Sequence, residues 1–186
     1  MPFVLELLLD ESAAARVRTI WEDLAAAGLP HHGLELETAP HVTIAVFEDL
    51  DPIEARSAFA SFAAEETPEP ITLYNPAAFP TAEGVLFLAP VVTRGLLELH
   101  AGFHERFAAL DQPVGEYFFP GNWVPHVTMG LGLDSEQLAR GLAVLMAADL
   151  PIHGHLDRLE LLEFQLGEDG RPAMPLELHH RLRLGQ

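Results

Sequence analysis

Two short stretches of this chain place a histidine and a threonine two positions apart, at His41 and Thr43 and again at His126 and Thr128. Both stretches are rich in apolar, β-branched residues, which favours strands. Because successive strand residues point to opposite faces, the histidine and threonine of each pair share a face. Two such strands facing one cleft would present two imidazoles and two hydroxyls, which supply an acid, a base and two neutral hydrogen-bond donors.

The opposite face of the first strand is apolar. Val42, Ile44 and Val46 are expected to point into a core, which turns His41 and Thr43 toward solvent or a cleft. Histidine suits both proton-transfer roles because its usual pKa of about 6.5 lies near neutral pH. We expect acidic surroundings to favour the imidazolium form of one ring. The threonine hydroxyls could donate hydrogen bonds to oxygen atoms of a substrate.

The segments after the two motifs are also alike. Asp51 precedes the apolar-periodic segment 53–66, and Asp134 precedes 138–150. Pro follows Asp51 directly, and Gln137 stands three residues after Asp134, so both aspartates are predicted helix N-caps. The duplicated unit is therefore a strand, a short loop and a capped helix, which suggests two similar halves related by a pseudo-twofold axis.

The two His-x-Thr motifs, 85 residues apart, resemble those of the two-histidine phosphoesterase superfamily, which includes the LigT-like RNA 2′,3′-cyclic phosphodiesterases, also called 2′-5′ RNA ligases. The resemblance implies metal-independent hydrolysis of a 2′,3′-cyclic phosphodiester to a 2′-phosphomonoester, without a cofactor, and possible reverse ligation. It implies that His41 donates a proton to the leaving oxygen and that His126 activates water. The residues alone do not assign these two roles.

One part of the chain departs from the family pattern. Many members place an Arg or Lys shortly after the second motif, where this chain has Gly130-Leu131-Gly132. The nearest basic residue downstream is Arg140, on a predicted helix. A cyclic phosphodiester carries only one negative charge, so weaker charge pairing is tolerable.

Five aromatic residues could stack a nucleobase beside the motifs, although residues of this kind more often fill a core. They are Tyr74, Phe79, Phe118, Phe119 and Trp123. Two other functions stay open. One is metal binding through His100 and His104, four apart on a predicted helix, or through His153 and His155 on one strand face. The other is a nucleotide-binding module that keeps the fold without catalysis.

Composition limits the partners. The 186 residues carry 10 basic residues, all Arg, against 28 acidic ones, a formal net charge of −18. Such a surface repels long nucleic acid, so a small nucleotide or an RNA terminus is the expected partner, although the charge could equally reflect solubility. Protein partners are not predictable. No cysteine and no membrane-spanning segment is found, and a cytoplasmic protein is expected.

Strands and helices interleave along the chain, and several neighbouring strands are joined by turns that only antiparallel pairing permits. The fold class is therefore α+β, with two small, mainly antiparallel sheets backed by helices and a cleft between pseudo-symmetric lobes. Residues 1–186 should form one bilobed domain. Beyond the motif strands, strands are expected at 3–9, 34–38, 71–74, 84–89, 156–166 and 174–184, further helices at 13–27 and 93–110, a loop at 111–121 and a hairpin turn at 167–170.

Overall fold

The computed structural model describes residues 2–30, 33, 38–79, 81–107, 116–167 and 172–186. Its strands are β1 (Phe3–Leu9), β2 (His41–Phe47), β3 (Glu69–Phe79), β4 (Val85–Pro90), β5 (Val127–Gly130), β6 (Ile152–Leu166) and β7 (Pro172–Arg183). Its helices are α1 (Glu11–Ala26), α3 (Pro52–Glu65), α4 (Arg94–Phe107) and α5 (Ser135–Ala147), with a 3-10 turn η2 (Glu116–Phe118).

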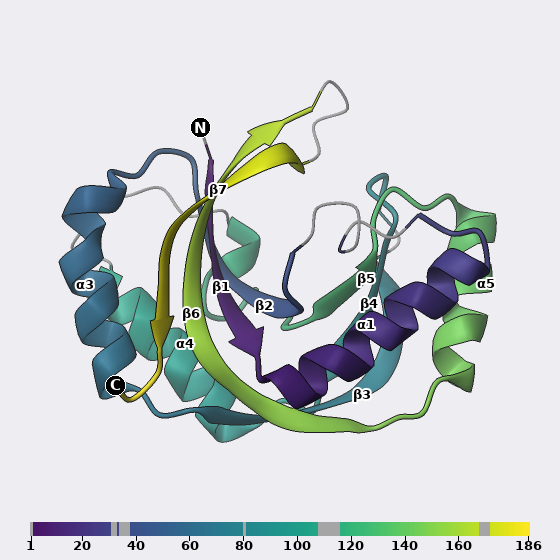
Figure 1. The fold of residues 1–186 in the computed structure, drawn as a ribbon, viewed down its shortest axis with the longest axis horizontal. Helices are drawn as coiled ribbons and strands as arrows, with labels where there is room; N and C mark the ends of the chain where they lie inside the picture. Colours follow the sequence, from purple (N-terminus) through teal and green to yellow (C-terminus); the bar gives the residue numbers. More distant parts are fainter. Residues whose placement is uncertain (1, 31–32, 34–37, 80, 108–115, 168–171) are drawn as a thin grey trace.

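The strands form an antiparallel sheet in the order β2-β1-β6-β3-β4-β5, with β7 also paired to β6. The long strand β6 pairs with β3 near its start and with β1 and β7 further along. It therefore joins two halves of the sheet, one on each side of the molecule in Figure 1. Strands β2 and β5, which carry the two motifs, are the ends of this order.

Helices flank each half of the sheet. Helices α3 and α4 lie on one side, and α1 and α5 lie on the other (Figure 1). Between α3 and α4, Phe59 and Phe62 pack on Phe103 and Phe107 with ring centroids 4.8 to 6.3 Å apart. Burying aromatic and aliphatic side chains in this way supplies the main driving force for holding the helices on the sheet.

Side-chain caps explain where the helices begin. Asp10 accepts a hydrogen bond from the backbone at the start of α1, and Asp51 does so for α3. Asp134 and Gln137 form a reciprocal capping box on α5, and Thr93 accepts from the backbone of Leu96 in α4. Each cap satisfies backbone donors that a helix start leaves unpaired. The strand, loop and capped-helix unit predicted after each motif is therefore present twice.

The α+β class with a mainly antiparallel sheet is confirmed, and its hydrogen bonding continues from one half to the other through β6. Strands β3 and β6 extend further than the predicted 71–74 and 156–166. Several predictions fall largely outside the described residues: the edge strand at 34–38, the end of the helix at 93–110, the first part of the loop at 111–121 and the hairpin turn at 167–170.

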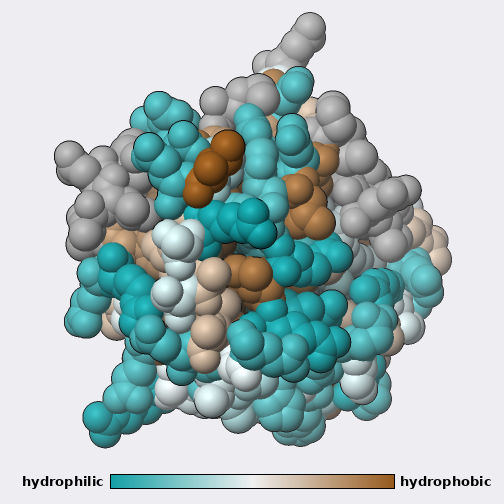
Figure 2. Space-filling model, turned by 60° about the vertical axis from the view of Figure 1, so that its left-hand side comes forward, coloured by the Kyte–Doolittle hydropathy of each residue, from teal (hydrophilic) through white to brown (hydrophobic). Residues whose placement is uncertain are grey.

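The face on the α3 side of the molecule is mainly hydrophilic, with hydrophobic residues scattered between polar ones (Figure 2). In the described part of the chain, no helix is long and apolar enough to cross a membrane.

Candidate active site

The two motif histidines are held in the same way. His41 Nδ1 lies 2.8 Å from the carbonyl oxygen of Ala39, and His126 Nδ1 lies 2.7 Å from that of Val124. In both cases the acceptor belongs to the residue before the proline that precedes the histidine. A carbonyl can only accept, so Nδ1 carries the proton in each neutral ring and Nε2 keeps a lone pair.

Each motif strand also has, directly after its threonine, one residue more than the strand it pairs with. In β2 the strand pairing skips Ile44, which follows Thr43, and in β5 it skips Met129, which follows Thr128. These are β-bulges, which bend a strand and change the direction of the side chains beyond them. The likeness of the two motif strands thus extends from the residue types to the backbone.

The bulge in β2 corrects one prediction. Val42 and Ile44 are buried on the core side as expected, but Val46 is only half-buried and lines the same cavity as His41. Simple alternation would put Val46 with Ile44. The extra residue shifts the alternation by one position, so the prediction for Val46 was wrong.

Both tryptophans of the chain bind a motif strand. Trp123 Nε1 donates to the carbonyl oxygen of Thr43 over 3.0 Å, and Trp21 Nε1 donates to that of Thr128 over 3.1 Å. In the described part of the chain β2 and β5 are end strands, so each has one edge that no other strand covers, and the two carbonyls have the indoles as their donors. The indoles satisfy them and cover the exposed strand edges. Trp123 belongs to the segment leading into β5, so its bond also ties β5 to β2.

A cavity of about 240 Å³ lies beside the motif residues and is called here the threonine cavity. His41, Thr43 and Thr128 line it together, so the fold brings three of the four predicted catalytic side chains to one space. Glu6 lines it as well, and its walls include Trp21, Phe118 and Phe164. No arginine is found among its described lining residues.

A second cavity of about 630 Å³, called here the His126 cavity, is lined by His126 itself. Its walls include Phe79, Phe118 and Trp123, with the polar residues Asn122 and Glu83 at its edge. Phe118 lines both cavities, so the two spaces adjoin at this residue. Three of the five predicted aromatic residues are thus found beside His126.

The other two predicted aromatic residues lie elsewhere. Tyr74 is exposed on β3, and Phe119 is exposed with its ring centroid 5.6 Å from that of His104. Neither is among the described residues that line the two cavities.

The two imidazoles have different neighbours. His41 Nε2 lies 3.2 Å from a carboxylate oxygen of the buried Glu6. His126 packs instead against a pair of phenylalanine rings, with its centroid 5.1 Å from those of Phe79 and Phe87, which lie 4.4 Å from each other. Glu6 pairs with Thr43 across β1 and β2, and Phe87 pairs with Thr128 across β4 and β5. A carboxyl group and a phenyl ring therefore occupy matching positions beside the two motifs.

Burial lowers the pKa of both rings. For His41, a hydrogen bond to Ala39 and the charge of Glu160 oppose this effect but do not reverse it. For His126, burial again lowers the pKa most, the bond to Val124 opposes it, and the charge of His41 lowers it further. Burial penalises the charged form of histidine. We expected acidic surroundings to favour the imidazolium form, but the pKa of each ring is lowered overall, so this expectation was wrong.

His100 and His104 on α4 serve the fold in this structure. Their Nε2 atoms lie 2.8 Å from the carbonyl oxygen of Phe118 and 3.2 Å from that of Ile44, respectively, and 3.1 Å from each other. The ring of His100 stacks on Trp123 with centroids 3.9 Å apart. These contacts hold η2 and the bulge of β2 against α4. Both Nε2 atoms are occupied, which argues against the metal-binding alternative at this pair.

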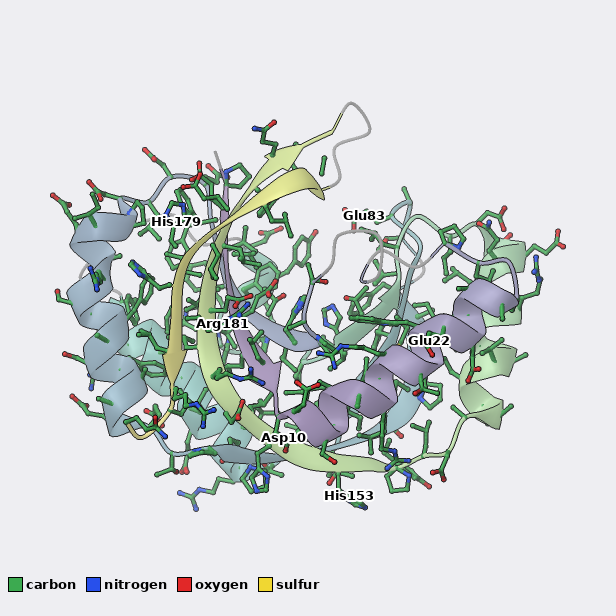
Figure 3. The ribbon with its side chains drawn as sticks, viewed as in Figure 1. Asp10, Glu22, Glu83, His153, His179 and Arg181 are labelled. Carbon is green, nitrogen blue, oxygen red and sulfur yellow. The ribbon has the colours of Figure 1, made fainter. Side chains whose placement is uncertain are left out.

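The four remaining histidines that the structure describes contact residues outside the two motifs. His153 bonds Thr72 and lies on the lower edge of the molecule in Figure 3, and the exposed His155 lies 3.5 Å from Asp10. His31 and His32 lie outside the described residues. One group could offer three metal ligands, Glu163, Glu177 and His179 on β6 and β7, and His179 lies well away from His153 in Figure 3. His180 bonds the carbonyl of Pro52.

Arg140 also lies outside both cavities. Its guanidinium donates to the carbonyl of Ala27 at the end of α1, where a positive charge suits the helix dipole. Leu131, in the segment that replaces the expected basic residue, lines the threonine cavity. The chain therefore departs from the family pattern in its structure as well. Among the described residues that line the two cavities, no arginine takes the place of the missing basic residue.

Glu6 and Trp21 are the site residues that the sequence did not reveal as such. Glu6 is the lone charged residue in the apolar strand β1, and this isolation is a usable signal. A charge within a buried strand costs free energy unless it has a partner or a function. Trp21 gave no comparable signal, because a tryptophan on the apolar face of a helix normally packs in a core.

The chain is similar to known proteins in its sequence and in its fold. A family model described as the 2′-5′ RNA ligase superfamily matches residues 9–168. No curated protein sequence matches the chain significantly. Among solved structures, TT0787 of Thermus thermophilus has 17% identity and a TM-score of 0.68, covering 100% of this chain and 98% of that chain.

Two ligand complexes share the fold. Escherichia coli LigT complexed with 3′-AMP has 16% identity and a TM-score of 0.63, with 100% of each chain covered. Kluyveromyces marxianus Usb1 with uridine monophosphate has 14% identity and a TM-score of 0.51, covering 98% of this chain and 97% of that chain.

Proposed function

Because the chain belongs to the 2′-5′ RNA ligase superfamily, we propose that it hydrolyses a 2′,3′-cyclic phosphodiester to a 2′-phosphomonoester by paired-histidine catalysis, without a metal ion. The substrate is a small nucleotide or an RNA terminus. His41, Thr43, His126 and Thr128 are the catalytic residues of this proposal. It treats residues 1–186 as one bilobed domain, and a cytoplasmic location stays a prediction.

The observation that carries the proposal is the matched hydrogen bonding of the two imidazoles. Each Nδ1 is tied to a backbone carbonyl two residues earlier, at 2.8 Å for His41 and 2.7 Å for His126. This fixes the tautomer and leaves Nε2 as the atom that exchanges protons. Acid and base catalysis of one displacement needs two such atoms. If the two histidines had only structural roles, His41 and His126 would not need the same hydrogen bond at Nδ1.

The reaction divides between the two rings. His126 Nε2 takes a proton from water, the water oxygen attacks phosphorus, and the bond from phosphorus to the 3′ oxygen breaks. His41 Nε2 gives that oxygen its proton, so the phosphate remains on the 2′ oxygen. The apolar setting of His126 beside Phe79 and Phe87 disfavours the charged form of the ring, which suits it to act as a base. The hydroxyls of Thr43 and Thr128 donate to the non-bridging oxygens.

The surroundings favour a small substrate. The described lining residues of both cavities include no arginine, so the grip on a phosphate depends on neutral donors and the histidines. Phe79, Phe118 and Trp123 offer aromatic surfaces to a base beside His126. The net charge of −18 disfavours long nucleic acid. The complexes of LigT with 3′-AMP and of Usb1 with uridine monophosphate, which share only the fold, are in keeping with a nucleotide ligand.

The test is turnover of 2′,3′-cyclic mononucleotides in the presence of a chelator. We expect His41→Ala and His126→Ala each to lower kcat by roughly 10²–10⁴-fold. His155→Ala removes an exposed histidine on β6 and serves as the matched control. Phosphorus NMR of the product should show a 2′-phosphomonoester. Full activity in His126→Ala, or loss of wild-type activity in chelator that added metal restores, would contradict the mechanism.

The same samples separate the alternatives. Calorimetric binding of a mononucleotide by wild-type protein that never turns over a cyclic phosphate would indicate a nucleotide-binding module. Incubating an RNA with a 2′,3′-cyclic phosphate end and one with a 5′-hydroxyl end would reveal the reverse ligation.

A further inference from the structure

A buried carboxyl group lies against the candidate acid. Glu6 is 4% exposed, and its Oε1 lies 3.2 Å from His41 Nε2. It stands in a row of directly paired residues that crosses four strands, from Thr43 on β2 through Glu6 on β1 and Glu160 on β6 to Arg181 on β7. Paired residues share a face of the sheet, so these side chains are neighbours. Arg181 on β7 is labelled in Figure 3, beside β6.

The contact between Glu6 and His41 requires a proton. His41 Nδ1 donates to Ala39, so the neutral ring turns a lone pair at Nε2 toward Glu6 Oε1. Two acceptors at 3.2 Å repel each other unless one carries hydrogen. Either Glu6 is a neutral acid that donates to Nε2, or His41 is charged and donates to a carboxylate. Both forms hold one proton between the same two atoms.

The surroundings of Glu6 favour the neutral acid before substrate binds. No described residue donates a hydrogen bond to its buried Oε2, which an ionised carboxylate would leave unsatisfied at a high cost. Next to Glu6, Glu160 is 2% exposed and forms an ion pair with Arg181. Glu160 is therefore the ionised carboxylate of this row, and a second negative charge on Glu6 would be repelled by it. Burial raises the pKa of Glu6 well above its usual value, and Glu160 raises it further.

This arrangement answers a question that the proposed mechanism leaves open. A general acid needs a proton at working pH, yet burial lowers the pKa of His41. A neutral His41 has none to give from Nε2. A proton stored on the adjacent carboxyl group would supply it.

We propose that Glu6 is a positioning residue that stores the proton which His41 delivers to the leaving oxygen. When the cyclic phosphate binds, its negative charge favours the imidazolium, and the proton moves from Glu6 Oε1 to His41 Nε2. His41 then passes it to the 3′ oxygen as the bond to phosphorus breaks, while His126 takes the proton of the attacking water. The product leaves, His126 returns its proton to solvent, and Glu6 regains one.

The second motif shows the contrast. In the position that matches Glu6, His126 has Phe87, and the described residues place no carboxyl group in hydrogen-bond contact with its ring. His126 acts as a base in the proposed mechanism, so a carboxyl group that stores a proton beside its ring would serve no purpose. The inference rests on the proposed function, because the stored proton has a use only if His41 acts as an acid.

The first test compares pH profiles of wild type, Glu6→Gln and Glu163→Gln. Glutamine keeps the size of Glu6 but cannot release a proton. We expect the basic limb of kcat/KM to move at least one pH unit lower in Glu6→Gln, so that kcat falls more than tenfold at pH 8 and much less at pH 6, with little change in KM. Glu163→Gln alters a different glutamate, which is half-buried and contacts a histidine, His179, at 2.8 Å, and this change should leave the profile unchanged. An equal loss at every pH in Glu6→Gln would overturn the proposal.

The second test needs no turnover. Nitrogen-15 NMR of labelled histidines follows protonation at His41 Nε2 across pH in the folded protein. We expect the last proton of the Glu6 and His41 pair to leave at a pH at least one unit higher in wild type than in Glu6→Gln. The same titration of His41 in both proteins would overturn the stored proton. If wild type turns over no cyclic phosphate, the proposed function fails instead, and the NMR result still decides whether the pair holds the proton.

Discussion

Trp123 donates its indole hydrogen to the carbonyl oxygen of Thr43 over 3.0 Å, across the gap between the two motif strands. The same ring stacks on the buried His100, whose own Nε2 contacts the carbonyl of Phe118. One side chain thus connects β2, the segment before β5 and helix α4. The orientation of the first motif relative to the second depends on this connection.

Replacing Trp123 with Phe removes the hydrogen bond and keeps a ring that can still stack. The Thr43 carbonyl then loses its donor in a partly buried place, which should lower the free energy of unfolding by about 1 kcal/mol. Urea denaturation measures the change. Trp21→Phe is the matched variant, because it removes the equivalent bond to Thr128, and we expect a loss of similar size. Unchanged stability in both variants would show that the indole bonds do not hold the strand edges.

A second prediction concerns the loop that follows the second motif. Gly84 has φ of +55°, and a Cβ atom there would lie 1.8 Å from the carbonyl oxygen of Leu133. The backbones of Glu83 and Gly84 accept hydrogen bonds from Gly132 and Leu133, which holds this loop on the start of β4. Ala at position 84 must therefore strain its own backbone and push the loop away.

We expect Gly84→Ala to lower the free energy of unfolding by at least about 2 kcal/mol, measured by urea denaturation. The control is Gly102→Ala within α4, where nothing lies within 4 Å of the added atom. That change should raise stability by about 0.5–1 kcal/mol, because Ala favours helix more than Gly does. Equal effects of the two substitutions would refute the argument from close contact.

The sequence predicted the parts of the site that depend on local pattern. Alternation alone placed His41 with Thr43 on one face of a strand, and Asp51 and Asp134 marked the helix starts. Local pattern failed at Val46, because a bulge depends on the pairing of two strands and leaves no clear mark in one of them. It also gave the wrong direction for the net pKa shifts of the histidines, since burial is a property of the folded chain.

The role of Glu6 could not be predicted for a similar reason. Its position as the one charge in an apolar strand hints at a function, but its partners His41, Glu160 and Arg181 come from three other strands. Their meeting depends on the order of strands in the sheet. The order places β1 between β2 and β6, which no local periodicity specifies.

A third prediction tests that row of charges. Glu160 is 2% exposed and paired with Arg181, whose side chain is 48% exposed. Arg181→Met leaves a buried carboxylate without its partner and should cost about 1–3 kcal/mol, less than a fully buried pair because solvent reaches the guanidinium. Adding Glu160→Gln removes the stranded charge and should recover part of the loss. A double variant less stable than Arg181→Met alone in urea denaturation would contradict this account.

The final prediction is a pH dependence of stability that comes from His100. Burial, aided by the charge of His104, lowers the pKa of His100 to about 4, whereas hydrogen bonds to backbone carbonyls oppose the shift. In the unfolded chain the ring titrates near its usual pKa of about 6.5. Between these values the unfolded state binds the proton and the folded state does not. Stability due to this group is therefore complete above about pH 6.5 and falls as the pH decreases toward 4.

The linkage predicts that wild type loses about 2 kcal/mol more than His100→Gln between pH 7.5 and pH 5. Glutamine cannot titrate but can still donate to the carbonyl of Phe118. The comparison separates the effect of His100 from that of Glu6, which is present in both proteins. The raised pKa of Glu6 increases stability as the pH falls, because the folded state then binds a proton that the unfolded state does not. Urea denaturation of both proteins at the two pH values measures the difference. Parallel loss of stability in the two proteins would mean that folding does not lower the pKa of His100.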